Sequence, residues 1–111
     1  MGSELKYEEL IKELLNDYAR EYSGGDNQPL KVVFDDVNQS YLILDVNWHK
    51  NEYIHHTPLH LDIIDQKIWI QYDDTQDGIA TDLLAAGVPA QDIVLGFRPP
   101  HARRYTEFAT G

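Results

Sequence analysis

The sequence predicts an α+β fold made of an N-terminal helix, an antiparallel β-meander of about four strands, a second helix, a final strand and a C-terminal tail. Two changes of hydrophobic period lead to this prediction. Between residues 7 and 22, apolar side chains recur every three or four positions, the spacing of a helix with one buried face. From residue 31 to residue 72 the period falls to two, and only short turns separate the segments, which favours antiparallel neighbours. A length of 111 residues fits one domain over residues 1–111.

The N-terminal helix is predicted from an apolar stripe that ends before two glycines. The stripe consists of Tyr7, Leu10, Ile11, Leu14, Leu15, Tyr18 and Tyr22. We expect this stripe to pack on the chain's own sheet rather than on a partner, because most helical stability comes from such packing. Glu8 and Lys12 lie one turn apart and predict an ion pair along the helix. Ser23-Gly24-Gly25 would end the helix with a left-handed cap.

Four segments with alternating side chains predict the meander. They span residues 31–35, 41–48, 53–64 and 67–72, with turns at 36–39, 49–52 and 65–66. One face of the second segment carries Leu42, Leu44, Val46 and Trp48, and the other carries Tyr41, Ile43, Asp45 and Asn47. One face of the third carries Leu59, Leu61 and Ile63, and the other carries His60 and Asp62. Pro58 cannot donate a ladder hydrogen bond, so we expect a bend there.

A second helix is predicted over residues 76–86, where Ile79, Leu83 and Leu84 form an apolar side. The candidates for its N-terminal cap are Asp73, Asp74 and Thr75. Gly87 fits the left-handed position just past its end. Residues 92–97 form the last predicted strand.

The net charge of −10 is unevenly distributed. The C-terminal tail, residues 97–111, holds three of the nine Lys and Arg residues but only one of the nineteen acidic residues. An acidic body is repelled by DNA, which proteins bind through clustered Lys and Arg. We therefore expect contacts with a basic protein surface rather than direct DNA binding.

The tail carries the side chains that best fit a partner-binding site. They are Arg98, Arg103, Arg104, Tyr105 and Phe108. Guanidinium groups bind carboxylates or phosphates, and the two rings offer apolar anchors. Pro99-Pro100 predicts an extended path for the chain. In the alternative, the tail folds back and its arginines pair with carboxylates of the body, and both arrangements can hold at once.

Two clusters raise the question of a metal, although neither matches an established motif. Imidazole and carboxylate groups of His56, His60 and Asp62 could ligate zinc or iron from one strand face. The carboxylates of a metal-dependent hydrolase could be Asp73, Asp74 and Asp77. Hydrogen-bonded histidines on a half-buried sheet, and carboxylates that cap a helix, explain the same residues more simply. We expect no metal, no cofactor and no enzymatic activity.

Other classes are excluded by composition. Cysteine is absent, so disulfides, thiolate nucleophiles and Cys-ligated zinc do not occur. No apolar run approaches the ~20 residues of a membrane span, and the charged N-terminus does not fit a secretory signal. We expect a location in the cytoplasm, and the sequence leaves a homo-oligomer open.

Motifs along most of the chain resemble the XisI family, named for a controlling factor in excision of the cyanobacterial fdxN element. They are His60-Leu61-Asp62-Ile63, Lys67-Ile68-Trp69-Ile70-Gln71, Asp77-Gly78-Ile79-Ala80, Leu83, Ala86-Gly87-Val88-Pro89 and Asp92-Ile93-Val94-Leu95-Gly96-Phe97. The pattern continues through Pro100, Arg103 or Arg104, Thr106, Phe108 and Ala109, which implies a tail ordered against the body. The chain departs from the family pattern at two places. Arg98 stands where the pattern has a His after the Phe, and Asp65-Gln66 stands where it has an Asn-Gly-like hairpin turn.

The resemblance implies an accessory protein in site-specific DNA excision, where a recombinase cuts and XisI-like and XisH-like proteins are required helpers. It supplies no catalytic residues. We therefore expect a non-enzymatic controlling factor that binds an XisH-like partner or the recombinase. Two alternatives remain open: an acidic DNA mimic that inhibits a nucleic-acid enzyme, and the metal-dependent hydrolase.

Overall fold

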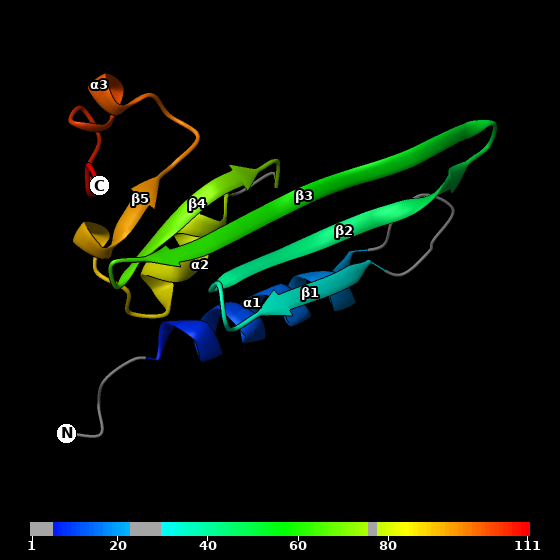
Figure 1. The fold of residues 1–111 in the computed structure, drawn as a ribbon, viewed down its shortest axis with the longest axis horizontal. Helices are drawn as coiled ribbons and strands as arrows, with labels where there is room; N and C mark the ends of the chain where they lie inside the picture. The colour runs from blue at the N-terminus through cyan, green and yellow to red at the C-terminus, as the bar shows by residue number, and fades with distance from the viewer. Residues whose placement is uncertain (1–5, 23–29, 76–77) are drawn as a thin grey trace.

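The computed structural model describes residues 6–22, 30–75 and 78–111, and its elements follow the predicted order. Helix α1 (Tyr7–Glu21) precedes strands β1 (Lys31–Asp35), β2 (Ser40–His49), β3 (Glu52–Ile64) and β4 (Lys67–Asp73). Helix α2 (Ile79–Ala85), the 3-10 turn η2 (Ala90–Asp92), strand β5 (Ile93–Leu95) and the short helix α3 (Pro100–Arg103) follow. One sheet runs in the order β1-β2-β3-β4-β5, antiparallel except for the β4–β5 pair (Figure 1). The predicted α+β class and meander are confirmed.

Three predictions fall on residues outside the described ranges. They are the Ser23-Gly24-Gly25 cap, the start of the second helix at Gln76, and the place of Asp77 in an acidic cluster.

Helix α1 packs on one face of the sheet, as its apolar stripe predicts. Ile11 and Leu15 are fully buried in a core that also contains Tyr41 and Ile43 of β2. The other face of β2 is less covered, and Trp48 on that face is 59% exposed. The face of β2 that packs in the core is therefore the one that starts with Tyr41 and Ile43 and becomes polar toward the end of the strand. The uniformly apolar face, which ends at Trp48, is not covered by α1.

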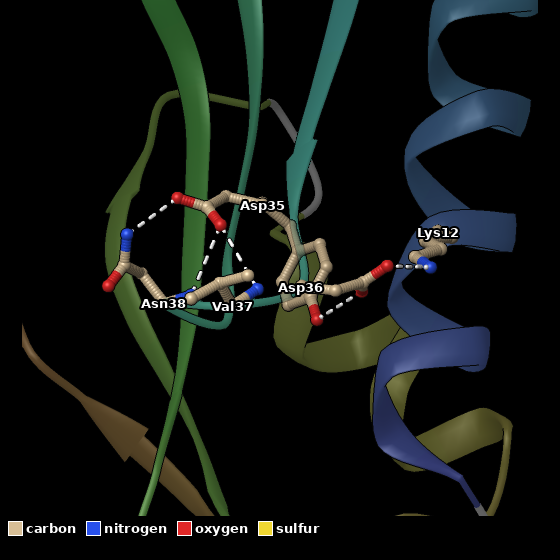
Figure 2. Close-up of polar contacts among 6 residues, drawn as sticks. Lys12, Asp35, Asp36, Val37 and Asn38 are labelled. Carbon is tan, nitrogen blue, oxygen red and sulfur yellow. Dashed lines mark hydrogen bonds and ion pairs between the residues drawn. The ribbon is translucent and has the colours of Figure 1, made fainter.

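A hydrogen-bonded ion pair joins α1 to the turn between β1 and β2. Lys12 Nζ lies 2.9 Å from the Asp36 carboxylate, which also accepts a hydrogen bond from the buried Tyr41 hydroxyl at 2.9 Å (Figure 2). These donors, Lys12 first, hold the pKa of Asp36 below its ordinary value. The Asp36 carboxylate likewise raises the pKa of Lys12. Lys12 thus pairs across the fold with Asp36 rather than along the helix with Glu8, because the turn brings a carboxylate to its ammonium group.

The turns of the meander form without glycine. The Asp35 carboxylate accepts backbone N–H bonds from Val37 and Asn38, both at 3.1 Å, so the turn after β1 carries its own acceptor (Figure 2). Asp65 and Gln66 both adopt positive φ, 52° and 66°, in the turn between β3 and β4. Two successive left-handed residues match the twist of a two-residue hairpin, so the predicted turn is confirmed despite its unusual residues.

Strand β3 is irregular on both sides of Pro58. Its pairing with β4 begins only at Leu59, and its register shifts between His60 and Leu61. Its pairing with β2 shifts opposite the same region, between Ile43 and Asp45. The apolar face predicted for this strand is buried in the core and consists of Leu59, Leu61 and Ile63.

The second helix begins at Ile79, and its N-cap position is held by Gly78 rather than by one of the predicted residues Asp73, Asp74 or Thr75. From the end of β4, the Asp73 carboxylate still accepts the Ile79 N–H at 2.6 Å and so satisfies the first backbone donor of the helix. Gly87, with a φ of 104°, ends the helix in the predicted left-handed position, and its N–H donates to the Leu84 carbonyl at 3.0 Å. Leu84 itself is 37% exposed, so it does not belong to the buried side with Ile79 and Leu83.

Strand β5 is shorter than predicted and runs parallel to β4. It covers Ile93–Leu95 because Asp92 ends the turn η2 and Gly96 and Phe97 form a turn. The parallel direction follows from α2, which supplies the crossover that a parallel neighbour requires.

The C-terminal tail is ordered against the body, as the family resemblance implies. Ala109 bridges to Val94 of β5, and its N–H donates to the Ile93 carbonyl at 2.8 Å. The extended path predicted for Pro99-Pro100 is wrong at Pro100. Pro99 is extended, but Pro100 is the first residue of α3, because the fixed φ of proline suits the first turn of a helix.

Among the described residues, no helix is both long enough and apolar enough to cross a bilayer.

Candidate partner-binding surface

Trp69 of β4 is the support on which the tail folds. Its neighbours Ile68 and Ile70 are buried in the core, so the alternation of the strand places Trp69 on the opposite face. The Arg103 guanidinium lies over the Trp69 ring, 5.0 Å from its centroid. Gly96 approaches the same ring so closely that an added Cβ would lie 3.2 Å from Trp69 Cε3. Neither Trp69 nor Gly96 was predicted as part of the site, although both lie within the family motifs.

Arg103 also joins separate parts of the tail through backbone carbonyls. Its Nε donates to the Arg98 carbonyl at 3.0 Å, and its terminal nitrogens lie 3.4 Å from the carbonyls of Gly96 and Thr110. A planar guanidinium with several donors suits such a junction. Arg103 is half-buried in this arrangement and holds the tail together, while its role in partner binding stays a prediction.

Phe108 is likewise engaged by the fold. It is half-buried and packs against the main core. Its N–H donates to Thr106 Oγ1 at 3.2 Å, and the Thr106 hydroxyl donates to the Arg103 carbonyl at 2.8 Å. Phe108 therefore anchors the tail from within, where its exposed surface is small.

The exposed part of the tail contains two arginine–aromatic pairs, which we call the tail surface: Phe97 with Arg98, and Arg104 with Tyr105. The Arg98 guanidinium lies 5.6 Å from the Phe97 ring centroid, and that of Arg104 lies 5.0 Å from the Tyr105 ring centroid. Arg104 also donates to the Tyr105 hydroxyl at 2.9 Å. Phe97 is 48% exposed and Tyr105 is 76% exposed. Phe97 was not among the predicted residues, although its position before Arg98 in the charged tail could have indicated it.

The tail arginines do not pair with the body's carboxylates in the way that the fold-back alternative predicts. Over residues 6–22, 30–75 and 78–111, the ion pairs involve Lys12, Arg20, His56 and His60. The tail does fold back, but carbonyls and aromatic rings receive its guanidinium groups. Arg98 and Arg104 are exposed and carry their charge toward solvent.

The histidine cluster is divided by the structure. His60 Nε2 lies 2.9 Å from Asp62, whose carboxylate also accepts a bond from Gln71 at 3.2 Å. His56 Nε2 instead lies 2.7 Å from Asp74. The structure therefore brings His60 and Asp62 together and places His56 elsewhere. No three potential ligands of the described residues gather around a common point.

The carboxylates before α2 are also engaged. Asp73 accepts the Ile79 N–H and, at 2.8 Å, the Thr75 N–H, and Asp74 pairs with His56. Hydrogen bonding thus accounts for the described members of both clusters.

Comparison with known proteins gives a consistent result over nearly the whole chain. The family model described as XisI protein matches residues 1–110. The crystal structure of a XisI-like protein from Anabaena variabilis ATCC 29413 superposes with a TM-score of 0.88 at 34% identity, covering 95% of this chain and 96% of that chain. That of the fdxN element excision controlling factor XisI from the same organism gives 0.79 at 35% identity, with the same coverage of 95% and 96%. No curated protein matches the chain.

Proposed function

Because the chain belongs to the XisI family, we propose that it is an excision controlling factor that acts through protein contacts and carries out no catalysis. The family assignment supports control of an fdxN-type excision, since a solved relative at 35% identity bears that description. The proposed partner is an XisH-like protein or a site-specific recombinase. Its proposed contact is the tail surface, Phe97, Arg98, Arg104 and Tyr105.

The exposed arginine–aromatic pairs are the observation that carries this proposal. Arg and Tyr are enriched among the residues that dominate binding energy, and aromatic rings tend to be buried in complexes rather than left in water. Tyr105 is 76% exposed here, on a segment that Arg103 and Phe108 hold in place. A held segment loses little conformational entropy on binding.

The charge distribution favours a protein partner over DNA. The net charge is −10, and the tail surface contributes two of the nine basic residues. Two arginines on an acidic molecule are too few for the counterion release that supports DNA binding. They suit instead a pair of carboxylates on a partner, which an Arg fork binds in two parallel hydrogen bonds.

Co-purification with the XisH-like protein tests the contact. Arg98→Glu with Arg104→Glu should weaken the complex by roughly 30-fold or more, the scale of a lost binding hot spot. Lys6→Glu with Lys31→Glu is the matched control, because both lysines are exposed and the change in net charge is the same. Circular dichroism shows whether each variant is folded. Unchanged binding by a folded Arg98/Arg104 variant would remove the tail surface from the proposal.

The net charge of −10 also supports the second candidate, an acidic DNA mimic that inhibits a nucleic-acid enzyme. That function predicts competition between this protein and DNA for the partner, and a complex that weakens steeply with salt. It also predicts that the Arg98/Arg104 variant binds as well as the wild type, since mimicry depends on carboxylates. Binding of the Arg98/Arg104 variant to the partner therefore separates the two candidate functions.

A further inference from the structure

The hairpin of β2 and β3 extends past the strands on both sides of it. β1 reaches only as far as Leu44 on β2, and β4 reaches only as far as Leu59 on β3. Toward the tip, residues 45–49 and 52–56 form strand pairs with one another, and no other described strand pairs with them (Figure 1). Such an unpaired strand edge is a template for another strand.

The register shows which backbone groups lie on the free edge of β3. Lys50 and Asn51 form the tip, so His49 and Glu52 close a two-residue turn and form a hydrogen-bonded pair. Hydrogen-bonded and non-hydrogen-bonded pairs alternate along an antiparallel ladder. Tyr53 and His55 therefore turn their N–H and C=O groups away from β2.

The projecting hairpin carries little net charge for so acidic a chain. Residues 45–56 carry two carboxylates, Asp45 and Glu52, against one lysine and three histidines. The rings of Trp48 and Tyr53 contact each other in a tilted arrangement, 5.0 Å between centroids, and are 59% and 53% exposed. Two copies with a net charge of −10 each repel less where they meet through such a segment than where their acidic surfaces face each other.

We propose that two copies of this chain join along the free edges of β3, antiparallel, about a two-fold axis at Ile54. In this register Tyr53 lies opposite His55 of the second copy, and these outward-facing residues exchange four backbone hydrogen bonds across the axis. Ile54 lies opposite itself, and Glu52 lies opposite His56 of the second copy, whose imidazole already pairs with Asp74. The edge is therefore complementary to itself in its backbone groups and in its apolar centre at Ile54, as a two-fold interface requires.

The register also keeps the two bodies apart. Residue 59, where β4 begins to cover β3, would lie opposite residue 49 of the other copy, past the end of its β3. The two bodies then extend from opposite ends of the joined hairpins. The resulting interface is short, so the dimer is weak, with a dissociation constant on the order of 100 micromolar.

Sedimentation velocity over a concentration series tests the interface with two proline variants. His55→Pro removes an outward N–H from each copy, hence two of the four hydrogen bonds, and should weaken the dimer at least roughly tenfold. Val46→Pro is the matched control, because Val46 pairs with His55 and turns its N–H to the opposite edge of the hairpin. Circular dichroism verifies that both variants fold. Equal weakening by the two variants would overturn the assigned edge.

Cross-linking tests the axis directly, since the chain contains no cysteine. A non-hydrogen-bonded pair brings Cα atoms to about 4.5 Å, within the range that a disulfide spans. Ile54→Cys should give a disulfide-linked dimer under mild oxidation, whereas Ile64→Cys, at the other end of β3, should stay monomeric. A wild-type monomer at every concentration, or Ile54→Cys that links no faster than Ile64→Cys, would overturn the proposal. A wild-type monomer at every concentration is also the result expected if the free edge of β3 pairs with a strand of a different protein.

Discussion

Replacing Arg103 with alanine should release the C-terminal tail while leaving the sheet folded. Arg103 is the single side chain that contacts the Trp69 ring at 5.0 Å and the carbonyls of Arg98, Gly96 and Thr110. Its removal leaves these carbonyls to water and takes the guanidinium off the Trp69 ring. The main core should persist, because it consists of buried hydrophobic side chains and Arg103 is not one of them.

The size of the effect follows from these contacts. A hydrogen bond from a charged donor contributes about 1.5–3 kcal/mol when well made, and a cation–π contact contributes about 0.5–1 kcal/mol at an exposed site. Only the bond to Arg98, at 3.0 Å, is short, and the other two are 3.4 Å. Since Arg103 is only half-buried, we expect a loss near the low end, about 2 kcal/mol. That corresponds to a roughly 30-fold larger population of the open tail.

Hydrogen exchange at the Ala109 amide measures this opening, because that N–H donates to the Ile93 carbonyl only while the tail is in place. Trp69 fluorescence in a Trp48→Phe background gives a second readout, since the chain has two tryptophans. Arg104→Ala is the control, as its guanidinium contacts only its neighbour Tyr105 among the described residues. The reasoning fails if Arg103→Ala leaves Ala109 exchange unchanged, or if Arg104→Ala accelerates it equally.

Two further predictions concern the body. Gly96→Ala should destabilise the protein by about 1–3 kcal/mol in chemical denaturation, because the new Cβ would lie 3.2 Å from the Ile70 carbonyl, which cannot move without distorting the sheet. Wild-type stability should fall as the pH drops below about 4, because the pKa of Asp36 is lower in the folded protein than in the unfolded chain. The ionised Asp36 carboxylate stabilises the fold above its unfolded pKa. This stabilisation is lost as the pH falls through its folded pKa. Asp36→Asn should flatten that part of the pH profile, and a profile as steep as that of the wild type would show that the bonds to Lys12 and Tyr41 contribute nothing.

The meander was predictable because its signals are local. Alternation and short turns determine antiparallel neighbours, so the limits of β1 and β4 agree with the sequence to within one residue. The core face of β2 was harder to assign, since it depends on where α1 crosses the sheet. Tyr41 and Ile43 lie under the helix, while Trp48 shares a longer apolar face that no described helix covers.

The tail was predictable in composition but not in the roles of its residues. Arg103 and Arg104 are neighbours of the same type, and nothing in the sequence distinguishes them. The one-turn helix α3 does so, since it directs Arg103 onto Trp69 and leaves Arg104 beside Tyr105. The ring that receives Arg103 lies 34 positions earlier in the chain, which is a tertiary relation that spacing cannot reveal.

The two proposed surfaces lie at opposite ends of the sheet, and this separation has a consequence for binding. Ala109 covers the β5 edge and the tail surface lies on either side of α3 in the chain at one end, while the tip of the β2–β3 hairpin forms the other (Figure 1). A dimer joined through the hairpins would therefore present two tail surfaces at its far ends. Two linked sites bind a dimeric or repeated partner far more tightly than one, even when the dimer itself is weak. Because Arg104 and His55 belong to different ends, a variant of either surface leaves the other intact, so each proposal can fail without the other.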